Sequence, residues 1–309
     1  MSKNVDELAE TISKSVNEFC DKAVTISFSG GVDSALIAYL ASKKCEVQLI
    51  AVGTSGSHDI EAAKTAAEEM KLDLEIVEMQ ADEMVREGKM LSSAVEMNER
   101  EIEFMLPFWV VAKRAKNETI LCGQGADELF GGYQRFRREP KKVNLKKEVR
   151  DLLKRIPKRE EAIAEKFGLK LGCPYLKKKV IEVAEKISTE EKINGIGKIP
   201  LRNAAKILGL SEKIANRKKK AAQYGSGSQK ALRKSKKHKM NITLTFENEK
   251  IAEGIEIATA PENEGWIKLE HNGNEIKVEI ASATIEGLKR TMDDFLECAT
   301  IAYQVNIEQ

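Results

Sequence analysis

Two kinds of apolar spacing alternate along the first 120 residues. Short continuous runs, AVTISFS at 23–29 and VQLIAVG at 47–53, are typical of buried strands, and shorter strands are expected near 74–77 and 118–122. Strands that alternate with helices indicate βαβ units and a parallel sheet. The intervening helices are expected over 5–20, 32–42, 59–70 and 99–116, the last with a kink or a break at Pro107.

The pattern changes beyond residue 140. Spacing is mostly helical up to about residue 211, and residues 240–309 then predict a βαββα unit. Its two inner strands flank Asn272-Gly273, a strong signal for a hairpin. The fold class is therefore predicted as α/β with a helical extension, followed by a small α+β domain. The elements of that small domain are expected at 240–246, 249–260, 265–270, 275–281 and 284–304.

Length and composition narrow the function classes. A chain of 309 residues corresponds to about two domains, predicted as 1–230 and 240–309 with a linker at 231–239. No apolar run approaches the roughly 18 residues of a spanning helix, and the N-terminus is acidic where a signal peptide is apolar. We therefore expect a cytoplasmic protein without membrane contact. Five scattered cysteines and three histidines argue for free thiols and against a zinc site or a histidine-based triad.

A glycine-rich turn separates the first predicted strand from the next helix. It consists of Ser29, Gly30, Gly31, Val32, Asp33 and Ser34. The glycines let the backbone approach an anion, and the N–H groups and dipole of the following helix attract phosphate. Ser29 and Ser34 add hydroxyl donors, whereas Asp33 beside a phosphate implies an intervening Mg²⁺. The alternative is an ordinary Gly-Gly turn with a helix cap.

A second acidic motif follows the strand expected at 118–122. Residues 121–133 read LCGQGADELFGGY, and four glycines in so short a stretch indicate close approach of the backbone to something. Asp127 and Glu128 at the carboxyl edge of a strand suit a metal or polyphosphate site. A surface turn is the alternative for a lone G-x-D-E.

The two motifs together resemble a known family. The glycine turn resembles the PP-loop (SGGxDS) of the ATP pyrophosphatases, which have an adenine nucleotide alpha hydrolase-like fold. Residues 121–133 resemble the G-E-G-[SA]-D-E-[VL]-F-G-G-Y motif of asparagine synthetase. The resemblance covers roughly residues 1–230. It implies binding of ATP, cleavage between the α- and β-phosphates, adenylation of a substrate, and displacement of AMP by a nucleophile.

The resemblance also implies roles for particular residues. Asp33 and Asp127 would share Mg²⁺ with the triphosphate, and Val52 and Gly53 would lie against the adenine. The nucleotide-facing turn of the second motif would be Gly123, Gln124 and Gly125. The turn Pro174-Tyr175-Leu176 resembles the family's P-F-L-D segment, with Lys177 in place of the acid.

Residues 216–239 form a basic block with ten Lys or Arg and no acid. It is either a solvated linker or a contact with the phosphates of a nucleotide or RNA. GSGS at 225–228 indicates local flexibility. Residues 217–225 resemble the family's R-x-K-x-x-x-F/Y segment, which implies that Arg217 and Lys219 are catalytic. Lys219 would neutralise charge on the pyrophosphate and the acyl-adenylate.

Three departures from the family argue against asparagine formation. Asparagine synthetase begins with a glutaminase domain whose nucleophile is an N-terminal cysteine, whereas this chain begins Met1-Ser2-Lys3 and would take ammonia, nitrogen from a separate donor protein, or a different nucleophile. The glutamate of G-E-G is Gln124 here, so a carboxylate that could act as a base is lost. The arginine expected to hold aspartate is Glu103, which would repel a carboxylate. ATP binding and adenylation are unaffected.

Residues 240–309 resemble, in the order of their elements, the smallest scaffold subunit of the KEOPS tRNA-modification complex. That resemblance implies a dimerising module that contributes to tRNA handling. The alternative is a generic α+β module. The amphipathic last helix and the sheet could form a homodimer interface. Lys289 and Arg290 are expected to be ordinary residues of the helix surface.

Three functions follow as hypotheses. The first is an ATP-dependent adenylating enzyme that activates a carbonyl or carboxyl group for a nitrogen nucleophile, with tRNA as the acceptor. The second is ammonia-dependent amide formation on a small carboxylate. The third is a non-catalytic, nucleotide-binding dimeric scaffold, against which the intact Asp33 and Asp127 count.

Overall fold

The computed structural model divides into two compact units. One comprises residues Met1–Gln80 and Pro107–Gly227, and the other comprises Ala81–Leu106 and Ser228–Gln309. The second unit thus takes a segment from the middle of the chain, which no sequence pattern indicated. The structure describes residues 3–138, 143–193, 197–217, 226–228, 232, 238–263, 267–282 and 285–307.

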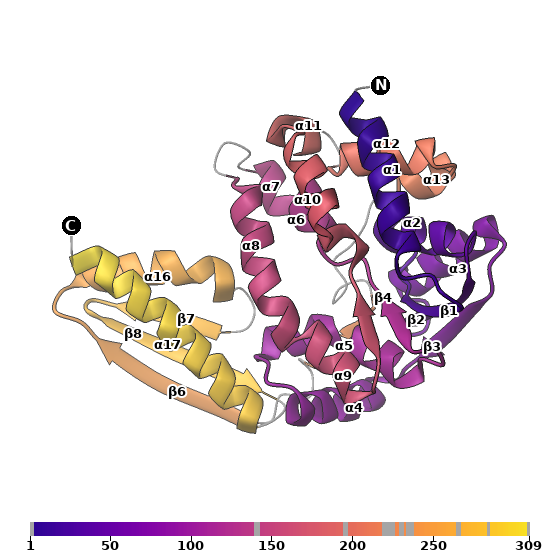
Figure 1. Cartoon of the computed structure of the whole chain (residues 1–309). Helices are drawn as coiled ribbons and strands as arrows, with labels where there is room; N and C mark the ends of the chain where they lie inside the picture. Colours follow the sequence, from indigo (N-terminus) through magenta and orange to yellow (C-terminus); the bar gives the residue numbers. More distant parts are fainter. Residues whose placement is uncertain are drawn as a thin grey trace. The chain divides into compact units, whose positions relative to one another are not determined.

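The first unit is built on a five-stranded parallel sheet. Its strands are β1 (Ala23–Ser27), β2 (Glu46–Gly53), β3 (Leu74–Glu78), β4 (Thr119–Leu121) and β5 (Lys170–Gly172). They lie in the order β3-β2-β1-β4-β5 (Figure 1). The predicted α/β class is confirmed. The short edge strand β5 was not predicted, since three residues carry too little periodicity to be recognised.

The strand order places the two sequence motifs side by side. From β1 the chain steps outward to β2 and β3, and it then returns to the other side of β1 as β4. Thr25 and Ile26 of β1 pair with Ile120 and Leu121 of β4. Both strands therefore end at one edge of the sheet, at the point where the order reverses. This is where open α/β sheets bind ligands.

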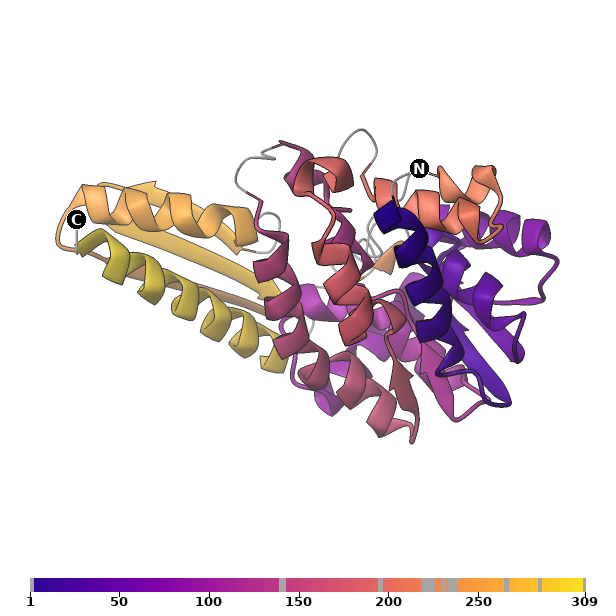
Figure 2. The same ribbon diagram turned by 45° about the horizontal axis from the view of Figure 1, so that its top comes forward.

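Helices surround this sheet. Helix α2 is buried on nearly its whole circumference, as expected for a helix at the centre of a domain. Helix α1 buries Leu8, Ile12 and Val16, and it packs on α10 and α12 (Figures 1 and 2). The helices of the unit are α1 (Lys3–Asn17), α2 (Val32–Ala41), α3 (His58–Met70), α6 (Ala126–Phe130), α7 (Gln134–Arg138), α8 (Leu145–Arg155), α9 (Glu160–Lys166), α10 (Lys178–Glu185), α11 (Thr189–Ile193), α12 (Ile199–Ile207) and α13 (Glu212–Ala215).

The second unit contains the predicted βαββα arrangement. Strands β6 (His238–Thr245), β7 (Ile267–Asn272) and β8 (Glu275–Ser282) form an antiparallel sheet of order β6-β8-β7. Helices α16 (Glu249–Asn263) and α17 (Ile285–Ile307) lie side by side on one face of the sheet (Figure 2). Along β8, Ile276, Val278 and Ile280 alternate into the core beneath them. The predicted hairpin at Asn272-Gly273 joins β7 to β8.

The segment 81–106 packs within this second unit. It forms α4 (Ala81–Ala94) and the first half of α5 (Glu99–Arg114). Arg290 of α17 donates to the carbonyl oxygen of Ser92 in the last turn of α4 at 2.7 Å, and to that of Val95 just after the helix at 3.3 Å. The expectation that Arg290 is an ordinary surface residue is therefore wrong, because its guanidinium satisfies carbonyls that the ending helix leaves unpaired.

Helix α5 excludes a break at Pro107, which was one of the two expectations for that residue. It runs from Glu99 to Arg114 without a break, although Pro107 lies inside it. The boundary between the two compact units falls at this proline. Among the described residues, every helix is too short or too polar to span a bilayer.

Candidate active site

The glycine turn after β1 has a fixed, preorganised shape. Gly30 has φ +66°, and a Cβ added there would lie 2.3 Å from the carbonyl oxygen of Ala62, so the turn packs closely on α3. The Ser34 hydroxyl accepts the N–H of Ser29 at 3.2 Å and lies 3.3 Å from the Ser29 hydroxyl. Gly31 is the N-cap of α2 and provides no side-chain cap. The first N–H groups of a ten-residue helix are therefore available to an anion.

Two predicted acids meet at the first turn of α2. Asp33 belongs to α2 and Asp127 to α6, and Lys198 bridges them. The Lys198 Nζ lies 2.7 Å from Asp33 Oδ2 and 2.6 Å from Asp127 Oδ1. Asp33 and Lys198 are buried, whereas the side chain of Asp127 is 22% exposed. The two carboxylates thus converge on a single cationic position that opens towards solvent on the Asp127 side.

Lys198 is the functional residue that the sequence reasoning missed. It is the N-cap of α12 with φ +57°, and its backbone N–H donates to the Phe130 carbonyl at 3.1 Å. That bond ties the start of α12 to the end of α6. A lysine among many surface lysines gives no signal by itself, and the only hint was its place after Gly197 at a Pro-marked helix start.

The glycines of the second motif make room for this cluster. A Cβ added to Gly132 would lie 1.9 Å from Asp127 Oδ1 and 2.1 Å from Lys198 Cε. A Cβ added to Gly123 would lie 3.0 Å from the Cβ of Asp33. The close backbone approach that the glycine content predicted is confirmed. At Gly123 and Gly132 the backbone lies against the side chains of Asp33, Asp127 and Lys198.

Gln124 is engaged with a carboxylate supplied from another helix. Its amide donates to Glu160 Oε1 at 2.6 Å, and Glu160 in turn pairs with Arg159, whose Nη2 lies 3.2 Å from the same oxygen. Arg159 and Glu160 are both buried. A carboxylate therefore lies one hydrogen bond away from the position where the family motif has glutamate, but it is held in an ion pair.

The Pro174-Tyr175-Leu176 turn supports the site from beneath. The Tyr175 hydroxyl donates to the backbone carbonyl of Asp33 at 2.9 Å, and burial raises the pKa of this phenol well above its usual range. A Cβ on Gly125 would lie 2.3 Å from Leu176 Cδ2. Lys177, in place of the family's acid, forms a surface ion pair with Glu18 at 2.8 Å.

All five cysteines are free thiols, as expected. Cys122 and Cys173 end adjacent strands β4 and β5, and their Sγ atoms are 3.5 Å apart. This contact raises the pKa of the Cys173 thiol, together with burial and the negative charges of Glu160 and Glu161. The Cys173 thiol is therefore not poised as a thiolate nucleophile.

The end of β2 is covered by residues from the basic block. The Thr54 N–H donates to the Ser226 carbonyl at 2.9 Å, and a Cβ on Gly53 would lie 3.2 Å from the same oxygen. Ser226 is 1% exposed. Ser226 and Gly227 thus pack on the loop that follows β2. Val52 is buried, which suits either a core residue or an adenine contact.

Arg217 reaches the start of α3. Its Nη2 donates to the His58 carbonyl at 3.3 Å, and burial lowers the pKa of this guanidinium below its usual value, an effect that Asp59 partly offsets. The buried guanidinium of Arg202 binds the carbonyls of Gly197 at 2.9 Å and Arg217 at 3.0 Å, and so joins the segment of Lys198 to that of Arg217. Lys219 lies outside the described residues.

The fit of a metal ion depends on the Asp33–Asp127 pair. The described part of the chain contains no group of three or more His, Cys, Asp or Glu able to hold a metal. The carboxylates of Asp33 and Asp127 nevertheless converge on one cationic position. Mg²⁺ is commonly bound by one or two carboxylates together with the phosphate oxygens of a substrate. Asp33 and Asp127 therefore fit a phosphate-bound Mg²⁺, and not a metal held by protein ligands alone.

A parallel sheet with a reversal at β1/β4, a glycine turn before a helix N-terminus and an acid pair beside it define a nucleotide-binding α/β protein. The family model for asparagine synthase matches residues 7–162 and 148–253. The chain therefore belongs to the asparagine synthase family, a family of ATP-utilising, amide-forming ligases.

Curated relatives agree with this assignment. A putative glutamine-hydrolysing asparagine synthetase 1 of Methanocaldococcus jannaschii is 36% identical over 256 residues, covering 68% of this chain and 47% of that protein. Asparagine synthetase B of Escherichia coli is 26% identical over 223 residues, covering 63% of this chain and 40% of that protein. The chain thus spans less than half the length of either relative.

Among solved structures, a predicted subunit of tRNA methyltransferase from Methanocaldococcus jannaschii aligns with a TM-score of 0.30 and 15% identity. The alignment covers 65% of this chain and 95% of the tRNA methyltransferase subunit.

Proposed function

We propose that this protein is an ATP-dependent adenylating enzyme. An acceptor oxygen attacks the α-phosphorus of ATP, the bond to the β-phosphate breaks, and pyrophosphate leaves. A nitrogen nucleophile then attacks the activated carbon, and AMP leaves. The observation that carries the proposal is the Asp33–Lys198–Asp127 cluster at the N-terminus of α2, at the switch point of the sheet.

Residues of the first unit have distinct roles in this reaction. The N–H groups of the glycine turn and the hydroxyls of Ser29 and Ser34 bind the phosphates that leave as pyrophosphate. The Lys198 ammonium is fixed by two carboxylates, so it presents positive charge to the leaving group without reorganisation. Arg217 and Lys219 add positive charge from the segment that follows α13.

Asp33 and Asp127 are the residues that would hold Mg²⁺ against the triphosphate. The ion would neutralise phosphate charge and favour attack at the α-phosphorus. Val52 and Gly53 at the end of β2 would border the adenine.

The acceptor is the second part of the proposal. Gln124 is hydrogen-bonded to the Glu160–Arg159 pair and offers no free base. The basic block 216–239 suits an acceptor that carries phosphates. We therefore propose a tRNA acceptor and a separate nitrogen donor. The KEOPS-like order of the second unit supports the same class. Amide formation on a small carboxylate with ammonia is the second candidate, and the 36% identity to a putative asparagine synthetase favours it.

We also propose that the second unit forms a homodimer. Its two helices expose apolar side chains that a monomer leaves in water, and a symmetric pair could bury them. These are Ile257, Leu296, Ile301 and Val305. Sedimentation should show a dimer for the full chain and a monomer for Ile301→Lys. A monomeric wild-type chain at micromolar concentration would contradict the proposal.

The catalytic cluster is tested by Lys198→Met. Loss of the ammonium removes charge stabilisation of the leaving group, so pyrophosphate release should fall by about 100-fold or more. Breaking a buried ion pair should also lower the free energy of unfolding by about 3–5 kcal/mol. Pyrophosphate release and denaturant unfolding measure the two effects.

Lys206→Met is the matched control on the same helix, because among the described residues the ammonium of Lys206 pairs only with the exposed Glu212, at 3.8 Å. It should leave both quantities unchanged. Lys198→Met with wild-type pyrophosphate release would overturn the assigned role of the cluster.

The acceptor is tested by the dependence of pyrophosphate release on added substrate. Release only with tRNA supports RNA modification, whereas release with aspartate and ammonia supports the second candidate. ATP binding without release under either condition supports the scaffold hypothesis. A log–log salt slope near zero for tRNA binding would remove the electrostatic basis of the first proposal.

A further inference from the structure

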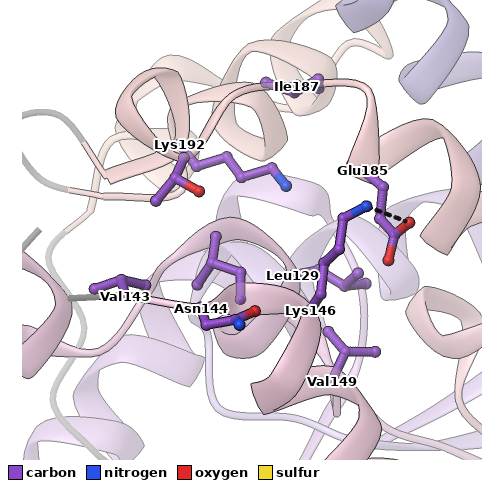
Figure 3. Close-up of a pocket in the computed structure, with 10 residues that line it drawn as sticks. Leu129, Val143, Asn144, Lys146, Val149, Glu185, Ile187 and Lys192 are labelled. Carbon is purple, nitrogen blue, oxygen red and sulfur yellow. Dashed lines mark ion pairs between the residues drawn. The ribbon is translucent and has the colours of Figure 1, made fainter. Parts of the chain in front are cut away.

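A separate pocket lies between α6, α8, α10 and α11 of the first unit (Figure 3). Its volume is about 270 Å³, just below the roughly 300–1,000 Å³ of pockets for drug-sized ligands. Leu129, Val149 and Ile187 form apolar walls. The pocket is therefore suited to a small ligand with a hydrocarbon body.

Lys192 brings a buried positive charge to this pocket. The residue is only 5% exposed, and its side chain extends into the pocket towards Lys146 and Glu185 (Figure 3). Burial lowers its pKa to about 8. At neutral pH the amine is thus still mostly an ammonium, although its position is largely desolvated.

The charged groups around Lys192 are Glu185, Glu191 and Lys146. Glu185 is neutralised by Lys146, whose Nζ lies 3.3 Å from its Oε2, and Glu191 accepts the N–H of Ser188 at 3.1 Å. Within the residues that the structure describes, Lys192 itself makes no ion pair. An anion entering the pocket would supply the missing partner.

We propose that this pocket binds a small carboxylate with a short branched hydrocarbon body. The carboxylate lies against the Lys192 ammonium, and the hydrocarbon lies against Leu129, Val149 and Ile187. The buried ammonium would form a charge-assisted hydrogen bond with the carboxylate, and burial of the hydrocarbon against the apolar walls would add to the binding free energy. The site is distinct from the Asp33–Lys198–Asp127 cluster and does not depend on the adenylation reaction.

The pocket shares structure with the nucleotide site in the same unit. Leu129 follows Asp127 by two residues on α6, and a Cβ on Gly131 would lie 2.2 Å from Ile193, the residue after Lys192. Ligand binding therefore contacts the same short helix that carries Asp127.

The test uses the full chain with lysine methylene carbons labelled for NMR, and two isosteric probes. 4-Methylpentanoate should bind and raise the Lys192 pKa by at least about one unit, because the carboxylate stabilises the ammonium. The uncharged 4-methylpentanamide keeps the hydrocarbon body, and it should bind at least about tenfold more weakly. Equal binding of the two probes would overturn the proposal without any variant.

Variants add an independent check. Lys192→Met should weaken 4-methylpentanoate binding by about tenfold or more while raising the melting temperature, because it removes a buried charge. Lys178→Met is the control for loss of one positive charge, since Lys178 is exposed on α10 and does not line the pocket. Undiminished binding to Lys192→Met, or no Lys192 shift at about 10 mM probe, would refute the site.

Discussion

At the residue scale, Glu128 shows how the site affects stability. It is buried beside Asp127, and its Oε1 accepts the Tyr133 hydroxyl at 2.7 Å. Burial, and then the negative charge of Asp127, raise the pKa of Glu128 above its ordinary value of 4.5, although Tyr133 and Lys198 act in the opposite direction. The folded protein therefore holds a proton on Glu128 at pH values where the unfolded chain has lost it.

This linkage predicts the effect of Glu128→Gln on the pH profile. Because the native state binds more protons above pH 4.5, wild-type stability falls as pH rises from 4.5 through the raised pKa. The variant lacks this loss and still accepts the Tyr133 bond. It should be more stable than wild type at pH 7, and the two should converge below pH 4.5.

Urea unfolding at several pH values measures the difference, whose slope cannot exceed about 1.4 kcal/mol per pH unit for one proton. Glu182→Gln, at an exposed position on α10, is the control and should leave the profile unchanged. A variant that is less stable than wild type at pH 7 would contradict the raised pKa.

At the scale of elements, the loop from β4 to α7 is shaped by the side chains that it covers. Gly132 passes directly over the Asp127–Lys198 ion pair, and its N–H donates to the Asp127 carbonyl at 2.8 Å. The loop thus closes back on the helix that carries the acid. Position 132 needs glycine for space and not for a positive φ.

Gly132→Ala should displace Asp127 and Lys198 from each other. A Cβ only 1.9 Å from Asp127 Oδ1 cannot be accommodated, so pyrophosphate release should fall about tenfold or more. Stability should fall by about 1–3 kcal/mol from overpacking. A steady-state pyrophosphate assay and thermal unfolding provide the two measurements.

Gly56→Ala is the matched control. Gly56 has φ +64° but nothing within 4 Å of an added Cβ, so this variant loses stability by about 1 kcal/mol and retains activity. Equal activity of the two alanine variants would show that space over the ion pair is unimportant.

At the scale of the whole molecule, the sequence of the first unit is interrupted by a segment that belongs to the second unit. Segment 81–106 lies in the sequence between β3 and β4 of the first unit, yet it joins the C-terminal strands and helices. Arg290 and Thr291 of α17 contact the backbone of this segment, the latter at the Glu99 N–H. The second unit is therefore assembled from two distant parts of the chain.

Arg290→Met should loosen the second unit alone. Carbonyls at the C-terminal end of α4 lose a charged donor, which costs about 1–3 kcal/mol, so amide exchange should accelerate by about 10- to 100-fold in α4 and α17. Amides of β1 and β2 should keep wild-type rates. Hydrogen–deuterium exchange followed by mass spectrometry measures both regions in one experiment.

Lys289→Met at the neighbouring exposed position is the control and should change neither region. Faster exchange in β1 and β2 after Arg290→Met would show that the two units unfold as one.

Much of the fold was readable from local patterns. Both the parallel sheet and the βαββα unit follow from apolar periods and from turn signals such as Asn272-Gly273, because these depend on neighbours in sequence. Helix α4 was missed because its sequence lacks a clear apolar pattern. Strand β5 was missed because it has only three residues. The predicted domain boundaries, Mg²⁺ and the tRNA acceptor remain predictions.

The sequence by itself determined which residues can meet an anion. A glycine turn before a helix and an acid after a parallel strand must lie at one sheet edge, which is why Asp33 and Asp127 are together. Only the tertiary structure decided what lies between them, since Lys198 enters from a helix 165 residues away from Asp33. The partners of Gln124 and Arg290 and the burial of Lys192 were likewise decided by packing, because contacts between distant segments leave no periodic trace in the sequence.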